Sequence, residues 1–210
     1  MIIIEQEADR VPPTVTDVTV PSGWTSAAVT VTVKATDDNG VAQYAVTSTN
    51  QAPSSGWQSA NTFKVTNNGT YYAWAKDQAG NVSAGKQFKI SNIDTTAPTV
   101  NSVSVPSTWG QTLTVTVNAT DTGSGIAQYG MTQTAQAPSS WQGSNTFKVT
   151  ANGTYYAWAK DQVGNVSPAK VFSVTKVDDQ PPAVIKVTEQ EQWGKTSTIT
   201  ITGEDKQTGI

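Results

Sequence analysis

Carboxylate and amide side chains recur at three places in the chain, each time beside the end of an alternating apolar segment. Hard oxygen ligands gathered at one end of a domain are what Ca²⁺ prefers. Turn chemistry is the alternative, because Asp and Asn also cap tight turns through bonds to their own backbone, and no contiguous calcium-loop motif is present. The candidate Ca²⁺ ligands are Asp37, Asp77, Asp94, Asp121, Asp161 and Asn165, with Asp9, Asp38 and Asn81 beside the first set and Asp178, Asp179, Glu204 and Asp205 forming a third.

A second candidate site is aromatic. The segment Tyr-Tyr-Ala-Trp-Ala-Lys occurs at 71–76 and again at 155–160. If it forms a strand whose lysine faces water, alternation places the second tyrosine and the tryptophan on the same outer face. An exposed ring there could bind a sugar or a protein; alternatively, the ring only covers the sheet beside a lysine stem. The candidate ligand contacts are Trp74, Trp158, Tyr72 and Tyr156.

Residue types that the chain lacks exclude several functions. It has no His and no Cys, and therefore no Ser-His triad, thiolate metal site or disulfide. A net charge of −3 with a single arginine excludes the basic face that a nucleic-acid binder needs. No apolar run reaches the roughly 20 residues of a membrane helix. We therefore expect no enzymatic activity, no nucleic-acid partner and no membrane segment; no cofactor is required, and Ca²⁺ is the one considered.

The elements that must position these residues repeat along the sequence. The stretch Asn-Gly-Thr-Tyr-Tyr-Ala-Trp-Ala-Lys-Asp-Gln at 68–78 returns at 152–162, and Gly-Asn-Val-Ser at 80–83 returns at 164–167. The period is 84 to 85 residues, which indicates successive copies of one structural unit. We predict an N-terminal extension at 1–8, repeats at 9–93 and 94–177, and an incomplete third repeat at 178–210.

Within a repeat the hydrophobic period is two. Between 29 and 36 the apolar residues Val, Val, Val and Ala alternate with the polar residues Thr, Thr, Lys and Thr, which predicts a strand with one dry face and one wet face. Turn residues interrupt such runs about every 8 to 12 residues, the spacing of a β-sandwich. Leucine, a main former of helical cores, is almost absent. The fold class is therefore all-β, with strands of the first repeat predicted at 14–20, 28–36, 41–47, 56–59, 61–66, 70–76 and 86–91.

The order of short motifs resembles a known family. Pro-Thr-Val, Ala-Thr-Asp, Gly-Ile-Ala-Gln-Tyr, Asn-Gly-Thr-Tyr-Tyr and Lys-Asp-Gln-Val-Gly-Asn-Val-Ser, recurring over residues 9–210, look like the tandem bacterial immunoglobulin-like repeats of exported surface proteins. The resemblance implies seven-stranded sandwiches with immunoglobulin or fibronectin-like topology, arranged as beads on a string, and no common active site. In this fold class Tyr71 and Tyr155 are expected to form tyrosine corners, with each hydroxyl bonded to backbone upstream.

These features predict a structural spacer or stalk of a bacterial cell-surface or secreted protein, which projects a distal module and contacts neighbouring repeats of the same polypeptide. Two alternatives stay open: an adhesive or carbohydrate-binding module for a host or cell-wall glycan or protein, and an accessory segment of a secreted polysaccharide-degrading enzyme. The predicted location is extracellular or on the cell surface. The short apolar start at 1–4 is followed by Glu5 and Glu7 and lacks the features of a signal peptide, so any signal or anchor is expected outside this sequence.

The third repeat holds only the first two strands and the start of the third, too little to bury a sandwich face. Three outcomes are open. The sequence is a fragment of a longer array, which we favour; strands donated by another molecule complete the fold; or the tail packs on the second repeat. Trp24, Trp109 and Trp193 lie between the first two strands of each repeat and are interpreted as plugs of the open end of the sandwich.

Overall fold

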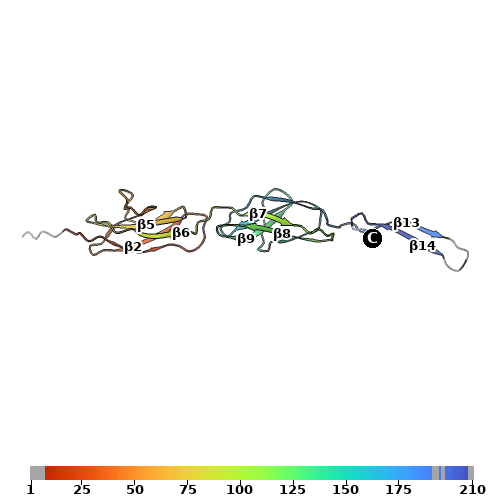
Figure 1. The fold of residues 1–210 in the computed structure, drawn as a ribbon, viewed down its shortest axis with the longest axis horizontal. Coiled ribbons are helices and arrows are strands. Elements are labelled where there is room, and N and C mark those ends of the chain that lie inside the picture. Colours follow the sequence, from red (N-terminus) through yellow and green to blue (C-terminus); the bar gives the residue numbers. More distant parts are fainter. Residues whose placement is uncertain (1–7, 191–193, 195–196, 208–210) are drawn as a thin grey trace, which may run out of the picture. The chain divides into compact units, whose positions relative to one another are not determined.

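The computed structural model describes residues 8–190, 194 and 197–207 of the protein (Figure 1). The protein divides into two compact units, Met1–Thr96 and Ala97–Ile210, and each is described by itself. Every regular element in the described residues is a β-strand. These residues include no helix with the length and apolarity that crossing a membrane requires. The prediction of an all-β fold is confirmed.

The first unit contains a sandwich of two three-stranded antiparallel sheets. Strand β2 lies between β1 and β4 in one sheet, and β5 lies between β3 and β6 in the other. This division of strands is that of an immunoglobulin or fibronectin-like sandwich, as predicted. The strands are β1 Thr14–Thr19, β2 Val29–Thr36, β3 Val41–Thr47, β4 Thr62–Val65, β5 Gly69–Asp77 and β6 Lys86–Ile90.

One predicted strand is reduced to a single bridge. The sequence predicts a strand at 56–59, but the structure has only an isolated bridge there, between Gln58 and Tyr44. The Gln58 side-chain amide donates to the carbonyl oxygens of Ala60 and Thr62, both at 2.9 Å. The segment is therefore held as a loop by local hydrogen bonds, and the seventh strand of the prediction is not formed as a regular strand.

The core follows the two-residue alternation. Strand β2 buries its three valines and exposes Thr30 and Lys34. Facing it, Ala73 and Ala75 of β5 are fully buried, as predicted from the phase of that strand. Short alanine side chains let the two sheets approach closely, and the valines fill the space between them.

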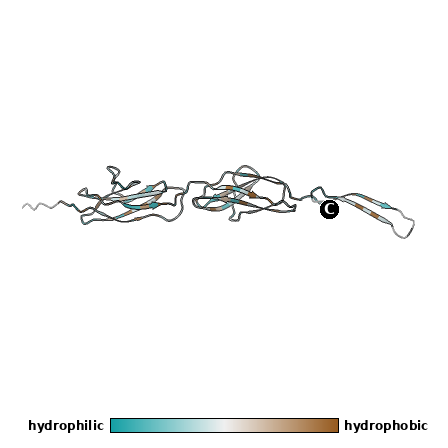
Figure 2. Cartoon of the chain, in the orientation of Figure 1, coloured by the Kyte–Doolittle hydropathy of each residue, from teal (hydrophilic) through white to brown (hydrophobic). Residues whose placement is uncertain are grey.

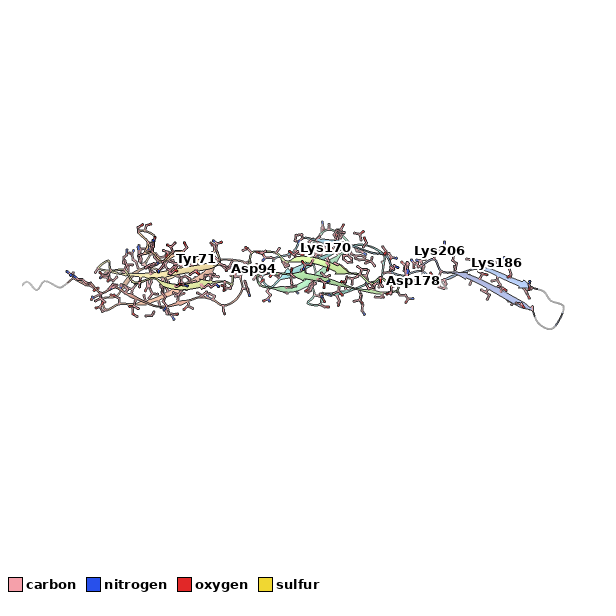
Figure 3. All side chains as sticks on the ribbon, in the orientation of Figure 1. Tyr71, Asp94, Lys170, Asp178, Lys186 and Lys206 are labelled. Carbon is pink, nitrogen blue, oxygen red and sulfur yellow. The ribbon has the colours of Figure 1, made fainter. Side chains whose placement is uncertain are left out.

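A tyrosine corner fixes the connection into β5. The Tyr71 hydroxyl donates to the carbonyl oxygen of Asn67 at 2.8 Å (Figure 3 labels Tyr71). In the second repeat the Tyr155 hydroxyl donates to the carbonyl oxygen of Ala151 at 2.9 Å. Each ring also stacks on a phenylalanine of the neighbouring strand, with centroids 5.8 Å apart. Both predicted corners are confirmed.

The second unit repeats this arrangement. Strand β8 lies between β10 and β7, and β11 lies between β12 and β9. The register shifts at the same place in both repeats, between Val15 and Asp17 in β1 and between Val100 and Ser102 in β7. The strands are β7 Thr99–Ser104, β8 Leu113–Thr120, β9 Ile126–Thr132, β10 Thr146–Val149, β11 Gly153–Asp161 and β12 Lys170–Val174.

The second unit ends in a two-stranded hairpin of β13 Ala183–Gln190 and β14 Thr198–Glu204. Its register shift lies between Val184 and Lys186, at the position that corresponds to the shifts in β1 and β7. Its apolar residues are largely exposed; Ile201, for example, is 65% exposed, and Figure 2 shows apolar positions on both strands. The repeat boundaries at 93/94 and 177/178 stay predictions. Trp193 lies outside the described residues.

The alternation predicts opposite effects for neighbouring positions on β2. Val31 is fully buried, so Val31→Asp places an unpaired charge between the sheets and is expected to cost at least about 3 kcal/mol. Thr30→Asp is the matched control, because Thr30 is exposed and lies opposite Lys64 in the ladder. Calorimetry should show loss of the first repeat's transition for Val31→Asp alone; equal tolerance of both changes would contradict the strand phase.

Candidate functional site

Three carboxylates of the first repeat meet at one end of the sandwich. Asp9 precedes β1, Asp37 follows β2 and Asp77 ends β5. One carboxylate oxygen from each lies within 4.8 Å of the others. The arrangement follows from topology, because β2 and β5 both end at this pole and β1 begins there. We call these three residues the acidic cluster.

Two of these carboxylates use one oxygen for a turn and leave the other for a ligand. Asp9 Oδ1 accepts from the Val11 amide at 2.9 Å, and Asp37 Oδ1 accepts from the Asn39 amide at 3.0 Å. The Oδ2 atoms of Asp9 and Asp37 are buried and have no hydrogen-bond partner among the described residues. Buried carboxylate oxygens without a donor are costly. The two interpretations of these residues, turn formers and metal ligands, are therefore compatible.

Asp77 is held by Asn81. The Asn81 backbone amide donates to Asp77 Oδ1 at 2.8 Å, and its side-chain amide donates to Oδ2 at 2.7 Å. Burial by itself raises the pKa of Asp77, but the hydrogen bonds from Asn81 and from the amides of Gly80 and Ala79 outweigh it, so that its pKa lies below the ordinary value of 3.8. Asp77 is therefore ionised at neutral pH and keeps lone pairs for a cation.

The second repeat contains the corresponding residues. Asp161 is 2% exposed and accepts from Asn165 through the backbone at 2.8 Å and the side chain at 2.7 Å. Asp121 Oδ2 accepts from the Gly125 amide at 2.6 Å, while its Oδ1 is buried and without a hydrogen-bond partner in the described residues. Asp94, the sequence counterpart of Asp9, is buried in the unit that ends at Thr96 and accepts from the Thr96 amide at 3.0 Å.

The third carboxylate set differs from the first. Asp179 Oδ1 accepts from the side-chain amides of Gln180 and Gln207, at 3.2 and 3.1 Å. These bonds hold the pKa of Asp179 below its ordinary value. Asp205 Oδ1 accepts from the Gln207 backbone amide at 2.8 Å. Because the glutamines already donate hydrogen bonds to these carboxylates, the carboxylate oxygens have less need of a cation as a partner.

The predicted exposure of Trp74 and Trp158 is wrong. Both lie on the outer face of the sheet as the alternation requires, opposite Ala45 and Gly130, but they are only 5% and 7% exposed. The indole N–H of Trp74 donates to Thr47 Oγ1 at 2.8 Å, and that of Trp158 makes the same bond in the second repeat. Their ring faces are not available as platforms.

An irregular segment lies on this outer face, at 48–61 in the first repeat and at 133–145 in the second; we call it the cover segment. A Cβ on Gly85 would meet both the Trp74 ring and Asn50 of this segment, and a Cβ on Gly130, opposite Trp158, would meet Pro138 and Trp141 of it. In the first repeat, the Trp57 indole N–H donates to the carbonyl oxygen of Pro53 at 3.0 Å, and Lys76 Nζ lies 4.6 Å from the Trp57 ring centroid. The same cation–π contact is made by Lys160 and Trp141 at 4.7 Å. The outer face thus carries a second small core, which the periodic pattern of the strands does not reveal.

The other aromatic residues considered in the sequence differ in exposure. Tyr72 and Tyr156 are half-buried on the strand that carries the covered tryptophans. Trp24 and Trp109 are 42% and 40% exposed, so their interpretation as plugs of the sandwich end is wrong. Trp109 instead lies under Lys176, whose Nζ is 5.6 Å from its ring centroid.

Paired hydrogen bonds at the opposite pole were not predicted from the sequence. The Asn68 side chain donates to the Ile93 carbonyl oxygen at 2.7 Å and accepts from the Ile93 amide at 3.0 Å. The Asn152 side chain makes the same two hydrogen bonds with the backbone of Val177, at 2.7 and 2.8 Å. We call each of these pairs of hydrogen bonds, Asn68 with Ile93 and Asn152 with Val177, an asparagine bracket. The only signal in the sequence is that both asparagines recur before glycine, which also suits an ordinary turn. These brackets fix the backbone where it leaves each sandwich.

Comparison with known proteins finds similarity only to solved structures. No protein-family model and no curated protein matches the sequence. The fibronectin(III)-like modules of CbhA from Clostridium thermocellum are 17% identical, with a TM-score of 0.34, over 79% of this protein and 97% of that structure. Chitinase ChiA74 from Bacillus thuringiensis is 21% identical, with a TM-score of 0.35, over 81% and 30%. The D00-D0 domain of intimin is 15% identical, with a TM-score of 0.34, over 77% and 98%. At these scores the similarities carry no argument about function, and the assignment of the fold rests on the strand order.

The cover segment predicts that position 130 must stay small. A Cβ at Gly130 would collide with Pro138 and press on the Trp141 ring. The first repeat has Ala45 at this position, together with a cover segment that is one residue longer through Gly56. We expect Gly130→Ala to destabilise the second repeat by about 1 to 3 kcal/mol, the cost of overpacking. Chemical denaturation measures it; Ala127→Gly, on the same strand but exposed, is the control for backbone entropy, and a stable Gly130→Ala protein would contradict the contact.

The lowered pKa of Asp77 predicts an acid-sensitive first repeat. Because the folded-state pKa lies below the unfolded value, the Asp77 carboxylate contributes stability above that value and loses it as the pH falls through the folded pKa. Asp77→Asn should therefore flatten the fall in melting temperature between about pH 4 and pH 2. The exposed Asp38→Asn is the control, and an unchanged acid profile in Asp77→Asn would show that the Asn81 bonds do not favour the ionised form.

Proposed function

We propose that the repeats are spacer modules of an exported protein that hold another part of that protein at a distance, and that Ca²⁺ stiffens the point where the backbone enters the first module. The proposal keeps the sequence-based expectation of a stalk located outside the cell. Neither a bound ligand nor a reaction is needed for this function, which suits a protein without His or Cys.

The observation that carries the spacer proposal is that the backbone is attached to the first sandwich at both poles. At one pole the Asn81 side chain donates to the carbonyl oxygen of Asp9 at 3.1 Å. At the other pole Asn68 brackets Ile93, and the Asn92 side chain donates to the carbonyl oxygens of Pro21 and Gly23, at 2.8 and 2.6 Å. Tension along the backbone would therefore pass into the folded body at its two ends.

Ca²⁺ at the acidic cluster would strengthen the first of these attachments. The cluster offers three carboxylates, two of them with a buried oxygen that lacks a hydrogen-bond partner in the described residues. Ca²⁺ binds through oxygen ligands of this kind, and sites in extracellular modules bind it at millimolar concentration. Bound Ca²⁺ would join Asp9, which precedes β1, to Asp37 and Asp77 after β2 and β5, and so fix the incoming backbone to the sandwich.

The adhesive alternative loses its main support because Trp74 and Trp158 are covered. A role beside a polysaccharide-degrading domain is compatible with a spacer, since such a segment would act by distance alone. We therefore propose no binding of sugar by these rings.

Pulling on the protein by its two termini tests the spacer function. A spacer should extend stiffly and then release each repeat in one step. The length gained is the contour length of about 84 to 85 residues at 3.3 to 3.6 Å each, roughly 300 Å, minus the length of the folded repeat. Gradual yielding at low force, without separate steps, would overturn the proposal. Asn68→Ala and Asn152→Ala should each lower the force at which one step occurs, because each removes one pair of hydrogen bonds. Asn39→Ala is the control and should leave the force of both steps unchanged, because the Asn39 side chain is exposed and hydrogen-bonds no other described residue.

Calcium titration tests the stiffening role separately. At ten times its dissociation constant Ca²⁺ should stabilise the first repeat by about 1.4 kcal/mol, which raises the melting temperature by roughly 6 to 11 °C, and EDTA should reverse the rise. Asp37→Asn should remove the response to Ca²⁺ but raise the melting temperature in EDTA, because it relieves repulsion among the carboxylates. Asp38→Asn should keep the response; if Ca²⁺ has no effect on the unmodified protein, the carboxylates act only as turn formers.

A further inference from the structure

Three Asn-Gly steps have the same sequence but different surroundings. They lie at 39–40, 68–69 and 152–153. Asn-Gly is the dipeptide in which the backbone nitrogen of the second residue most easily reaches Cγ of the first, because glycine has no side chain to obstruct it. Whether that attack occurs in a folded protein depends on how firmly the asparagine side chain and the glycine backbone are held.

Two of the Asn-Gly dipeptides are held by hydrogen bonds on the asparagine side chain and by strand pairing of the glycine. The Asn68 side chain is held on both its amide nitrogen and its carbonyl oxygen by the backbone of Ile93, and Asn152 is held in the same way by Val177. The glycines that follow them are the first residues of β5 and β11, paired in the ladders with Ile90 and Val174. An attack at either step must first break two side-chain hydrogen bonds and release the start of a strand.

The step at 39–40 has neither restraint. Asn39 is exposed, and no hydrogen bond of its side chain to another described residue is formed. Gly40 precedes β3 and belongs to no strand. Its φ is +93°, and a Cβ built on it would meet no atom within 4 Å, so the space beside its Cα is open. The corresponding loop of the second repeat, 121–125, contains no asparagine.

We propose that Asn39 is a selective site of spontaneous deamidation, whereas Asn68 and Asn152 are protected. The Gly40 backbone nitrogen attacks Asn39 Cγ and forms a bond to it, and the bond between Cγ and the Asn39 amide nitrogen Nδ2 breaks. The proton from the Gly40 nitrogen leaves with Nδ2 as ammonia, and a succinimide ring remains. Water then opens the ring at either carbonyl, which yields aspartate or isoaspartate at position 39, with no oxidant or cofactor.

The modification changes the loop that carries Asp37. It adds one negative charge two residues after Asp37, beside Asp38. In the isoaspartate product the backbone gains one carbon between residue 39 and Gly40, close to the Asn39 amide that donates to Asp37 Oδ1 at 3.0 Å. The corresponding loop of the second repeat, 121–125, has no asparagine and therefore cannot change in this way. This inference does not depend on the binding of Ca²⁺.

Peptide mapping by mass spectrometry tests the proposal on the intact protein, incubated in mildly alkaline buffer at physiological temperature and sampled over time. Deamidation at Asn39 should be roughly ten- to a hundred-fold faster than at Asn68 or Asn152, the factor expected when two hydrogen bonds must open first. In concentrated denaturant the three rates should become similar, because the dipeptides are identical. Asn39→Gln should remove the fast phase of ammonia release, since its longer side chain would require a larger ring.

Two results would overturn the proposal. Native rates that are equal at the three sites, or slowest at Asn39, would show that the brackets do not protect. A persistent preference for Asn39 in denaturant would show that local sequence, not folding, selects the site. As a matched variant, Asn39→Asp reproduces one product, so anion-exchange chromatography should show aged wild-type protein eluting with it, while an aged Asn39→Gln protein keeps its original position.

Discussion

The packing of the valine face of β2 against the alanine face of β5 is the interaction on which each repeat depends. Val33 and Ala75 are fully buried in one cluster, and the protein has no disulfide to hold the sheets together. Small residues on β5 set the distance between the sheets. The strand directions then place the ends of β2 and β5 at the same pole, where Asp37 and Asp77 meet.

The two outer faces of each sandwich differ in their exposure to solvent. The sheet of β1, β2 and β4 exposes threonines, which suit a wet strand surface. The sheet of β3, β5 and β6 is covered by an irregular segment and gains a second core around Trp74. Within that core the two repeats compensate: Ala45 occurs with the longer cover segment that contains Gly56, and Gly130 occurs with the shorter one. Close packing under a loop, rather than the ladder alone, therefore limits which residues a repeat accepts.

The features that could be predicted are those that follow from period and topology. Alternation indicated the buried positions of β2 and β5 and the outward side of Trp74, and the antiparallel order brought Asp9, Asp37 and Asp77 to one pole. The burial of Trp74 could not be found in this way, because its cover comes from a segment without periodicity, anchored through Gln58 and Trp57. The Asn68 bracket was equally hidden, since an asparagine before glycine looks the same whether it only forms a turn or also binds a distant backbone.

The brackets at Asn68 and Asn152 have a consequence for how a protein of this kind can change in length. Each closes the exit of a sandwich with residues of that sandwich, 25 positions apart in sequence. A copy of the coding segment inserted or lost by unequal recombination would therefore break none of these bonds in the copies that remain. Genes for such repeats can expand or contract in whole steps while every encoded module still folds, and natural variants of this protein are expected to differ by integral numbers of repeats.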